Sequence, residues 1–212
     1  MKLLRNLLLC VSVAFAFSAC GSDTSPSETF GEIKTQIQQL RGTKAASPNA
    51  EQIKAALTPE VRAQFGNRPF IVTTMDEPPV SAGLFLVSDR QGKKIYQTVD
   101  NIALTLDGGI VVATRGLGFD LMDADVRQIH GAIRNGGGRA SRVHRYLDGE
   151  NHTVLRAFDC VIEVQGTSAV EKCYGYDTEF ENMYRTNQAG AIVASRQWLG
   201  PERGFISIED LG

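Results

Sequence analysis

The chain has 212 residues, of which 42% are hydrophobic and 22% charged, and its formal net charge is −2 at pH 7. This length suffices for one or two domains with a hydrophobic core. Binding nucleic acid or anionic lipid through charge needs a basic surplus, which this chain lacks. Its glycine and aromatic contents are ordinary for a folded domain. These totals exclude nucleic-acid-binding, collagen-like, disordered and multi-pass membrane proteins.

The first residues have the features of a secretory signal. Lys2 and Arg5 precede an apolar stretch over 7–17, which as a helix would span about 16 Å and is too short to cross a membrane. The sequence Phe17-Ser18-Ala19-Cys20 resembles the lipobox of bacterial lipoproteins, in which cleavage leaves a lipid-modified cysteine as the first residue. The alternative is an ordinary signal peptide that ends near a cysteine.

We therefore expect residues 1–19 to be a signal peptide and Cys20 to carry a covalent lipid, with no other cofactor. The Asp that retains such lipoproteins in the inner membrane does not follow Cys20, where Gly21 and Ser22 stand. The expected location is the periplasmic face of the outer membrane. Residues 20–27 would form a tether so short that the folded part stays close to the membrane.

Helical signals come next, and we expect a single β-rich domain with N-terminal helices over 28–212. Ser25-Pro26-Ser27-Glu28 combines an N-cap serine, a proline at the first helical position and a glutamate three residues after the serine, which predicts a helix start. An apolar stripe follows this start, formed by Phe30, Ile33, Ile37 and Leu40. A second short helix is expected to open at Ser47-Pro48, and another turn at Thr58-Pro59.

From residue 70 onward the pattern is that of an antiparallel sheet. Short β-branched or aromatic runs cover 70–75, 83–88, 94–99, 102–106 and 110–114. The turn Asp107-Gly108-Gly109 joins the last two runs. After a helical interlude at 124–134, longer strands are expected at 141–147, 153–165, 174–186 and 191–199. About nine strands joined by hairpins predict a mainly β fold, either a barrel-like or a sandwich domain.

Two cysteines of the expected mature domain, Cys160 and Cys173, form an even pair in an oxidising compartment. A two-residue turn at Gly166-Thr167 would place them directly opposite each other in an antiparallel pair. The pattern of side chains argues against the bond, because the face that holds Cys173 also holds the acidic residue Glu171. A disulfide and two buried free thiols both remain possible.

Several segments then resemble one family. The run Asp100 to Gly109, the strand pair around Asn182-Met183-Tyr184-Arg185 and Asn187-Gln188-Ala189-Gly190, and the tail Ser195 to Gly200 are similar to the YjbF family of group 4 capsule polysaccharide lipoproteins, also called the GfcB family. The resemblance covers nearly the whole chain. It implies a barrel-like β domain with a role in making or exporting exopolysaccharide, and it carries over no catalytic residue.

Two histidines could act as metal ligands. His144 and His152 flank Asp148-Gly149, and a hairpin centred there would place them opposite each other. A zinc site needs neutral imidazoles and a third ligand, whereas arginines crowd this region, so we expect an exposed polar hairpin and no metal site. No nucleophile elbow, dinucleotide fingerprint or carboxylate pair stands out, which favours a protein that is not an enzyme.

Aromatic residues near the C-terminus are the candidates for a surface that binds glycan or a protein partner. They are Tyr174, Tyr176, Tyr184 and Trp198. Aromatic rings on a strand can stack on sugars, but in a β domain they more often form the core. Two other docking sites are an open sheet edge and the polar loop over 135–139.

The resulting hypothesis is an accessory or assembly factor for exopolysaccharide or capsule secretion that works by binding. Its expected partners are the outer membrane through the lipid, an outer-membrane exporter or other secretion proteins, and the polysaccharide itself, but not nucleic acid. The alternatives are a periplasmic enzyme that modifies glycan and a general envelope lipoprotein unrelated to polysaccharide.

The substitution Cys20→Ala tests the anchor. Several acyl chains, each buried CH₂ adding about 0.8 kcal/mol, would hold the wild-type protein on the membrane effectively permanently. We expect the variant either to become soluble in the periplasm or to remain uncleaved, as measured by cell fractionation and mass spectrometry. Wild-type protein found free in the soluble fraction would contradict the lipid anchor.

Overall fold

The computed structural model describes residues 47–148, 150 and 152–212. The signal peptide, Cys20, the tether and the helix with the stripe from Phe30 to Leu40 lie outside the described residues. Among those that are described, no helix is both long and apolar enough to cross a membrane.

Two short helices open the described part of the chain. Helix α2 (Ala50–Ala56) begins after Asn49 rather than Ser47, because Asn49 and Gln52 exchange side-chain and backbone hydrogen bonds in a capping box. Helix α3 (Pro59–Gln64) has the expected start, with Thr58 as its N-cap. The chain then packs Phe65 against Phe85 of the sheet, with 3.7 Å between the ring centroids.

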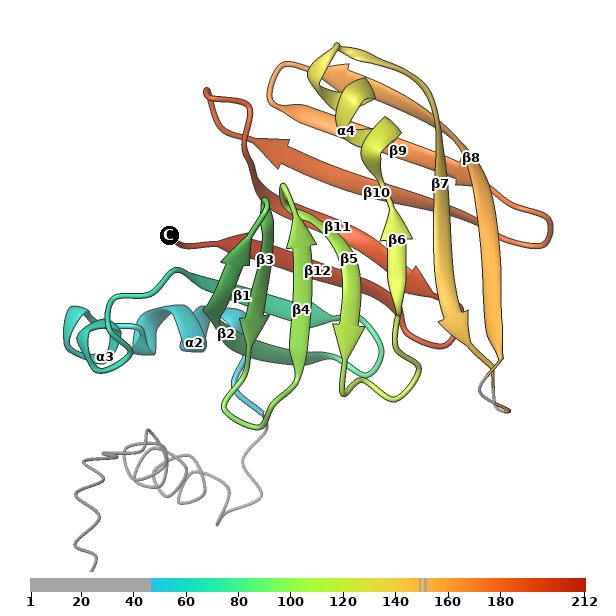
Figure 1. Ribbon diagram of the computed structural model, residues 1–212. Coiled ribbons are helices and arrows are strands. Elements are labelled where there is room, and N and C mark those ends of the chain that lie inside the picture. Colours follow the sequence, from blue (N-terminus) through green and yellow to red (C-terminus); the bar gives the residue numbers. More distant parts are fainter. Residues whose placement is uncertain (1–46, 149, 151) are drawn as a thin grey trace, which may run out of the picture. The chain divides into compact units, whose positions relative to one another are not determined.

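Twelve antiparallel strands form one sheet that curls into a nearly closed barrel (Figure 1). The strands are β1 (Phe70–Met75), β2 (Val80–Arg90), β3 (Lys93–Gln97), β4 (Ala103–Asp107), β5 (Ile110–Arg115), β6 (Asp123–Asp125), β7 (Gly137–Leu147), β8 (Thr153–Gln165), β9 (Ser168–Tyr174), β10 (Glu179–Thr186), β11 (Ile192–Gly200) and β12 (Gly204–Asp210). Their order is β5-β4-β3-β2-β1-β12-β11-β10-β9-β8-β7-β6. Helix α4 (Arg127–Arg134) lies between β6 and β7 in the sequence. The mainly β prediction is confirmed, and of its two alternatives the barrel is found.

Three differences explain why twelve strands appear where about nine were predicted. The expected strand over 174–186 begins only at Glu179, because Gly175 N donates to Thr178 O and closes a turn between β9 and β10. The sequence predicts no strand over 168–174 and none at β12. In β12, Ile206 and Ile208 are both buried, as alternate positions of a strand should be. The interlude expected over 124–134 starts with strand β6, so that its helix begins at Arg127.

The barrel closes between its two edge strands, β5 and β6, through side chains and loops. The backbone N–H of Thr114 donates to Leu121 O, which joins the end of β5 to the segment before β6. The buried amide of Gln197, on β11, accepts from Val111 N and donates to Gly109 O, each at 2.9 Å. On the other side, Gln128 of α4 accepts from Ser141 N. These edge groups are already bonded, so the open sheet edge considered as a docking site is not available at them.

Candidate functional site

The inner faces of three strands, β7, β9 and β10, carry a cluster of buried polar residues. Arg142 and His144 lie on β7, Glu171 on β9, and Asn182 and Tyr184 on β10. They point inward because side chains alternate along each strand, and each shares its face with apolar residues such as Ala140 and Phe180. Burying a charge in such surroundings is costly unless it is paired and hydrogen-bonded.

Glu171 is the acceptor that joins this cluster. The guanidinium Nη1 of Arg142 lies 2.8 Å and 3.0 Å from its two carboxylate oxygens, and the exposed fractions of the two side chains are 1% and 0%. Asn182 Nδ2 donates to the same carboxylate at 2.8 Å, and the Tyr184 hydroxyl donates to it as well. Asn182 Oδ1 in turn accepts from Trp198 N at 2.7 Å, which extends the network to β11.

The buried surroundings shift the pKa values of Tyr184 and Arg142. Burial raises the pKa of Tyr184, and the negative charge of Glu171 raises it further, so that the hydroxyl remains a donor. Burial disfavours the charge on Arg142, but the opposite charge of Glu171, the influence of Tyr184 and the hydrogen bonds to both together outweigh it, so the pKa of Arg142 is raised. Tyr184 therefore remains a neutral hydrogen-bond donor beside the ion pair of Arg142 and Glu171.

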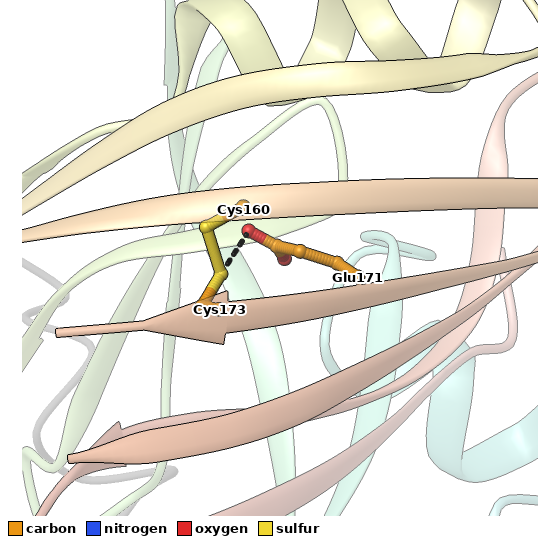
Figure 2. A group of neighbouring side chains, drawn as sticks. All are labelled: Cys160, Glu171 and Cys173. Atoms are coloured by element: carbon orange, nitrogen blue, oxygen red, sulfur yellow. Dashed lines mark hydrogen bonds between the residues drawn. A yellow bond between two sulfur atoms is a disulfide. The ribbon is translucent and has the colours of Figure 1, made fainter.

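The disulfide between Cys160 and Cys173 is confirmed, with 4.1 Å between the two Cα atoms. Cys160 pairs with Cys173 in the register of β8 and β9, as the turn at Gly166-Thr167 predicted. Figure 2 shows Glu171 beside the bond, with its Oε1 at 3.2 Å from Cys173 Sγ. A disulfide sulfur has no proton to donate, so this approach is a close contact in the oxidised protein.

The same three residues have the spacing of a metal site, since one ligand atom of each lies within 4.8 Å of the others. Their bonding argues against that use. The two sulfurs are bonded to each other and so are not thiolates, and the carboxylate of Glu171 already accepts from Arg142, Asn182 and Tyr184. The group is a disulfide next to an ion pair.

The sequence predicted that His144 lies in an exposed hairpin, and this prediction is wrong. The loop after β7 is longer than two residues, because Leu147 pairs with Thr153 and Asp148 accepts from the N–H of His152. His144 is therefore opposite Arg156 and far along the strand from the loop, with no exposed surface. His152 remains exposed beside Asp148.

The hydrogen bonds around His144 define its tautomer. The Tyr146 hydroxyl donates to Leu199 O at 2.8 Å, so it accepts from His144 Nδ1 at 2.7 Å and the proton lies on Nδ1. The imidazole stacks on Trp198 with 5.7 Å between the ring centroids. Burial, together with the nearby charge of Arg142, lowers the pKa of His144 well below its usual value of 6.5.

The four candidate surface aromatics divide into two pairs. Tyr184 and Trp198 are 3% and 6% exposed, so the surface hypothesis is wrong for them and the core alternative holds. The Trp198 ring stacks on Phe180 at 4.4 Å. Tyr174 is half exposed and Tyr176 fully exposed, because Cys173 takes the inward position and the turn before β10 breaks the alternation. These two remain candidates.

The fold and this interior define the class of protein. It is a nearly closed β-barrel domain in whose interior Arg142, Glu171, Asn182 and Tyr184 are hydrogen-bonded to one another. The family model for the group 4 capsule polysaccharide lipoproteins GfcB and YjbF matches residues 33–211. The chain therefore belongs to the YjbF family, and to a family of membrane-anchored envelope lipoproteins.

A solved structure has a similar fold. The crystal structure of the hypothetical lipoprotein YmcC from Escherichia coli (K12) matches with a TM-score of 0.61 and 16% sequence identity, over 79% of this chain and 97% of that one. No curated protein matches the sequence significantly.

The buried polar cluster inside the barrel was not predicted from the sequence. Arg142, Asn182 and Gln197 were not predicted to be buried, although each stands on a strand among apolar positions of the same face. Glu171 was noticed, but as an objection to the disulfide. The missing information was the register between distant strands, which decides whether a charge on an inner face has a partner.

The substitution Glu171→Gln tests the ion pair. It keeps the size of the side chain but leaves the charge of Arg142 buried and unpaired, so we expect the free energy of unfolding to fall by about 3–5 kcal/mol. Glu163→Gln, on the exposed face of β8, is the matched control and should change stability by less than about 0.5 kcal/mol. Urea unfolding measures both, and equal stability of the two variants would contradict a structural role for the pair.

The lowered pKa of His144 predicts a pH dependence of stability. The unfolded chain binds a proton on this residue near pH 6.5, whereas the folded protein does so only at much lower pH. This stabilising contribution is therefore fully present above pH 6.5 and is lost as the pH falls below it, by at most about 1.4 kcal/mol per pH unit.

His144→Asn retains a donor for Tyr146 and removes the titration. We expect its free energy of unfolding to fall less steeply between pH 6.5 and 5 than that of wild type, while His152→Asn, at an exposed position, keeps the wild-type slope. The lowered pKa of His130 contributes to both proteins and cancels in the comparison. Identical slopes for wild type and His144→Asn would show that the buried imidazole does not titrate as described.

Proposed function

We propose that this lipoprotein is a non-catalytic accessory or assembly factor for the secretion of exopolysaccharide or capsule. In this proposal it is anchored through Cys20 on the periplasmic face of the outer membrane. The observation that carries the proposal is the match to the capsule polysaccharide lipoproteins over residues 33–211. The expected partners are an outer-membrane exporter or other secretion proteins, and the polysaccharide.

The arrangement of the interior supports a role in binding. The buried ion pair of Arg142 and Glu171 is sealed in the barrel, where no polysaccharide reaches it. Contacts with a partner would then be made by the outer surface. Tyr174 and Tyr176 are exposed there and offer rings on which a sugar or a partner side chain can pack.

Deletion of the gene tests the proposed function. We expect the deletion strain to carry less surface polysaccharide, measured by immunoblotting of surface extracts, with normal envelope integrity measured by detergent and vancomycin sensitivity. Re-expression of the full-length protein should restore the polysaccharide. A leaky envelope with normal polysaccharide would instead indicate a general envelope lipoprotein.

The purified protein incubated with the strain's polysaccharide separates binding from catalysis. We expect no change in chain length and no new reducing ends. Shortened chains would contradict the non-catalytic proposal and indicate an enzyme that acts on glycan.

A further inference from the structure

A hollow of about 210 Å³ lies between helix α4 and strands β7 and β8. It is lined by Gln128, Arg139, Ala140, Ser141, Asp159 and Cys160. Ser141 lies directly opposite Asp159 in the register of the two strands, on the outer face of the sheet. Pockets for drug-sized molecules measure about 300–1,000 Å³, so this hollow suits one small ring.

Its polar groups are free to bind a ligand. Gln128 accepts from the backbone N–H of Ser141, which fixes its position and leaves its two amide protons to donate. Within 47–212, masked positions aside, the side chains of Arg139, Ser141 and Asp159 make no hydrogen bond or ion pair with one another or with other residues. The hollow thus offers a cation, an amide, a hydroxyl and a carboxylate side by side.

An exposed aromatic ring stands at the border of this hollow. Tyr174 of β9 lies directly opposite Asp159, on the same outer face, and is 51% exposed. Cβ atoms of directly opposed residues in a sheet are about 4.5–5.5 Å apart, so the ring is next to the carboxylate.

The turn that follows Tyr174 is held firmly in place. Arg156 Nη1 lies 3.2 Å from Asp177 Oδ1, and Gly175 N donates to Thr178 O at 2.8 Å. Gly175 rests on the Phe158 ring so closely that an added Cβ would lie 2.8 Å from it. The same turn presents Tyr176, whose side chain is fully exposed. The aromatic rings are therefore carried by a fixed part of the fold, which lowers the cost of ordering them on binding.

A sugar ring matches these groups in chemistry. Its C–H face packs on an aromatic ring, and its hydroxyls donate to a carboxylate and accept from guanidinium and amide groups. Resting on the proposed function, we propose that the hollow and Tyr174 form a subsite for one sugar residue of the polysaccharide. Asp159 accepts from ring hydroxyls, Gln128 and Arg139 donate to them, Tyr174 stacks on the ring, and Tyr176 contacts the next sugar along the chain.

The test is calorimetric titration of the full-length lipoprotein in detergent with oligosaccharides made by partial hydrolysis of the source strain's surface polysaccharide. We expect saturable binding by the wild type. Asp159→Ala should weaken it at least about tenfold, as the loss of a charged hydrogen-bond acceptor does, and Tyr174→Ala roughly three- to tenfold. The matched controls Glu202→Gln and Phe119→Ala, which change an exposed carboxylate and an exposed ring elsewhere, should bind as the wild type does.

Every outcome separates this proposal from the function on which it rests. Unchanged unfolding midpoints show that the variants are folded. Wild-type affinity in folded Asp159→Ala and Tyr174→Ala would overturn the subsite, although the protein binds glycan. A wild type that binds no oligosaccharide would also overturn the subsite, and the polysaccharide of the deletion strain would then decide separately whether the role in secretion stands.

Discussion

The carboxylate of Glu171 holds together strands β7, β9, β10 and β11 of the barrel. It receives hydrogen bonds from Arg142 on β7 and from Asn182 and Tyr184 on β10, and Asn182 accepts from the backbone of β11. The network thus joins side chains of β7, β9 and β10, and through Asn182 it reaches the backbone of β11. Moving any of these strands by one residue would turn its polar group outward and leave a buried charge unpaired, which costs several kcal/mol, so the network fixes the register of the sheet.

The disulfide and the aromatic stack complete the same interior. Cys160 and Cys173 join β8 to β9 next to the carboxylate, and the rings of Phe180, Trp198 and His144 fill the space beyond it. The two cysteines are 13 residues apart in the sequence, and in the chain-entropy model closing a loop of that size adds roughly 3 kcal/mol to stability. An interior occupied in this way acts as a support, and the proposed work of the protein falls to side chains on the outside such as Tyr174 and Asp159.

Local features of the fold could be predicted from the sequence because their causes are local. The strand over 153–165, the turn at Gly108-Gly109 and the pairing of Cys160 with Cys173 follow from alternation and turn chemistry within a few residues. The polar interior could not be predicted in this way. Glu171 argued against a buried face, but its partner Arg142 lies 29 residues away in the sequence and two strands away in the sheet. Likewise Tyr184 and Tyr174 looked equivalent until the turn at Gly175 placed them on opposite faces.

The double variant Arg142→Met with Glu171→Gln tests the central claim that the interior is structural and the outer surface functional. It removes both buried charges and keeps an acceptor for Asn182 and Tyr184, so no unpaired charge remains. In the deletion strain, the measurement is surface polysaccharide restored by this variant, at a protein level equal to that of wild type. The account predicts full restoration. A folded, membrane-bound double variant that restores no polysaccharide would contradict it, since the buried pair would then take part in the function itself.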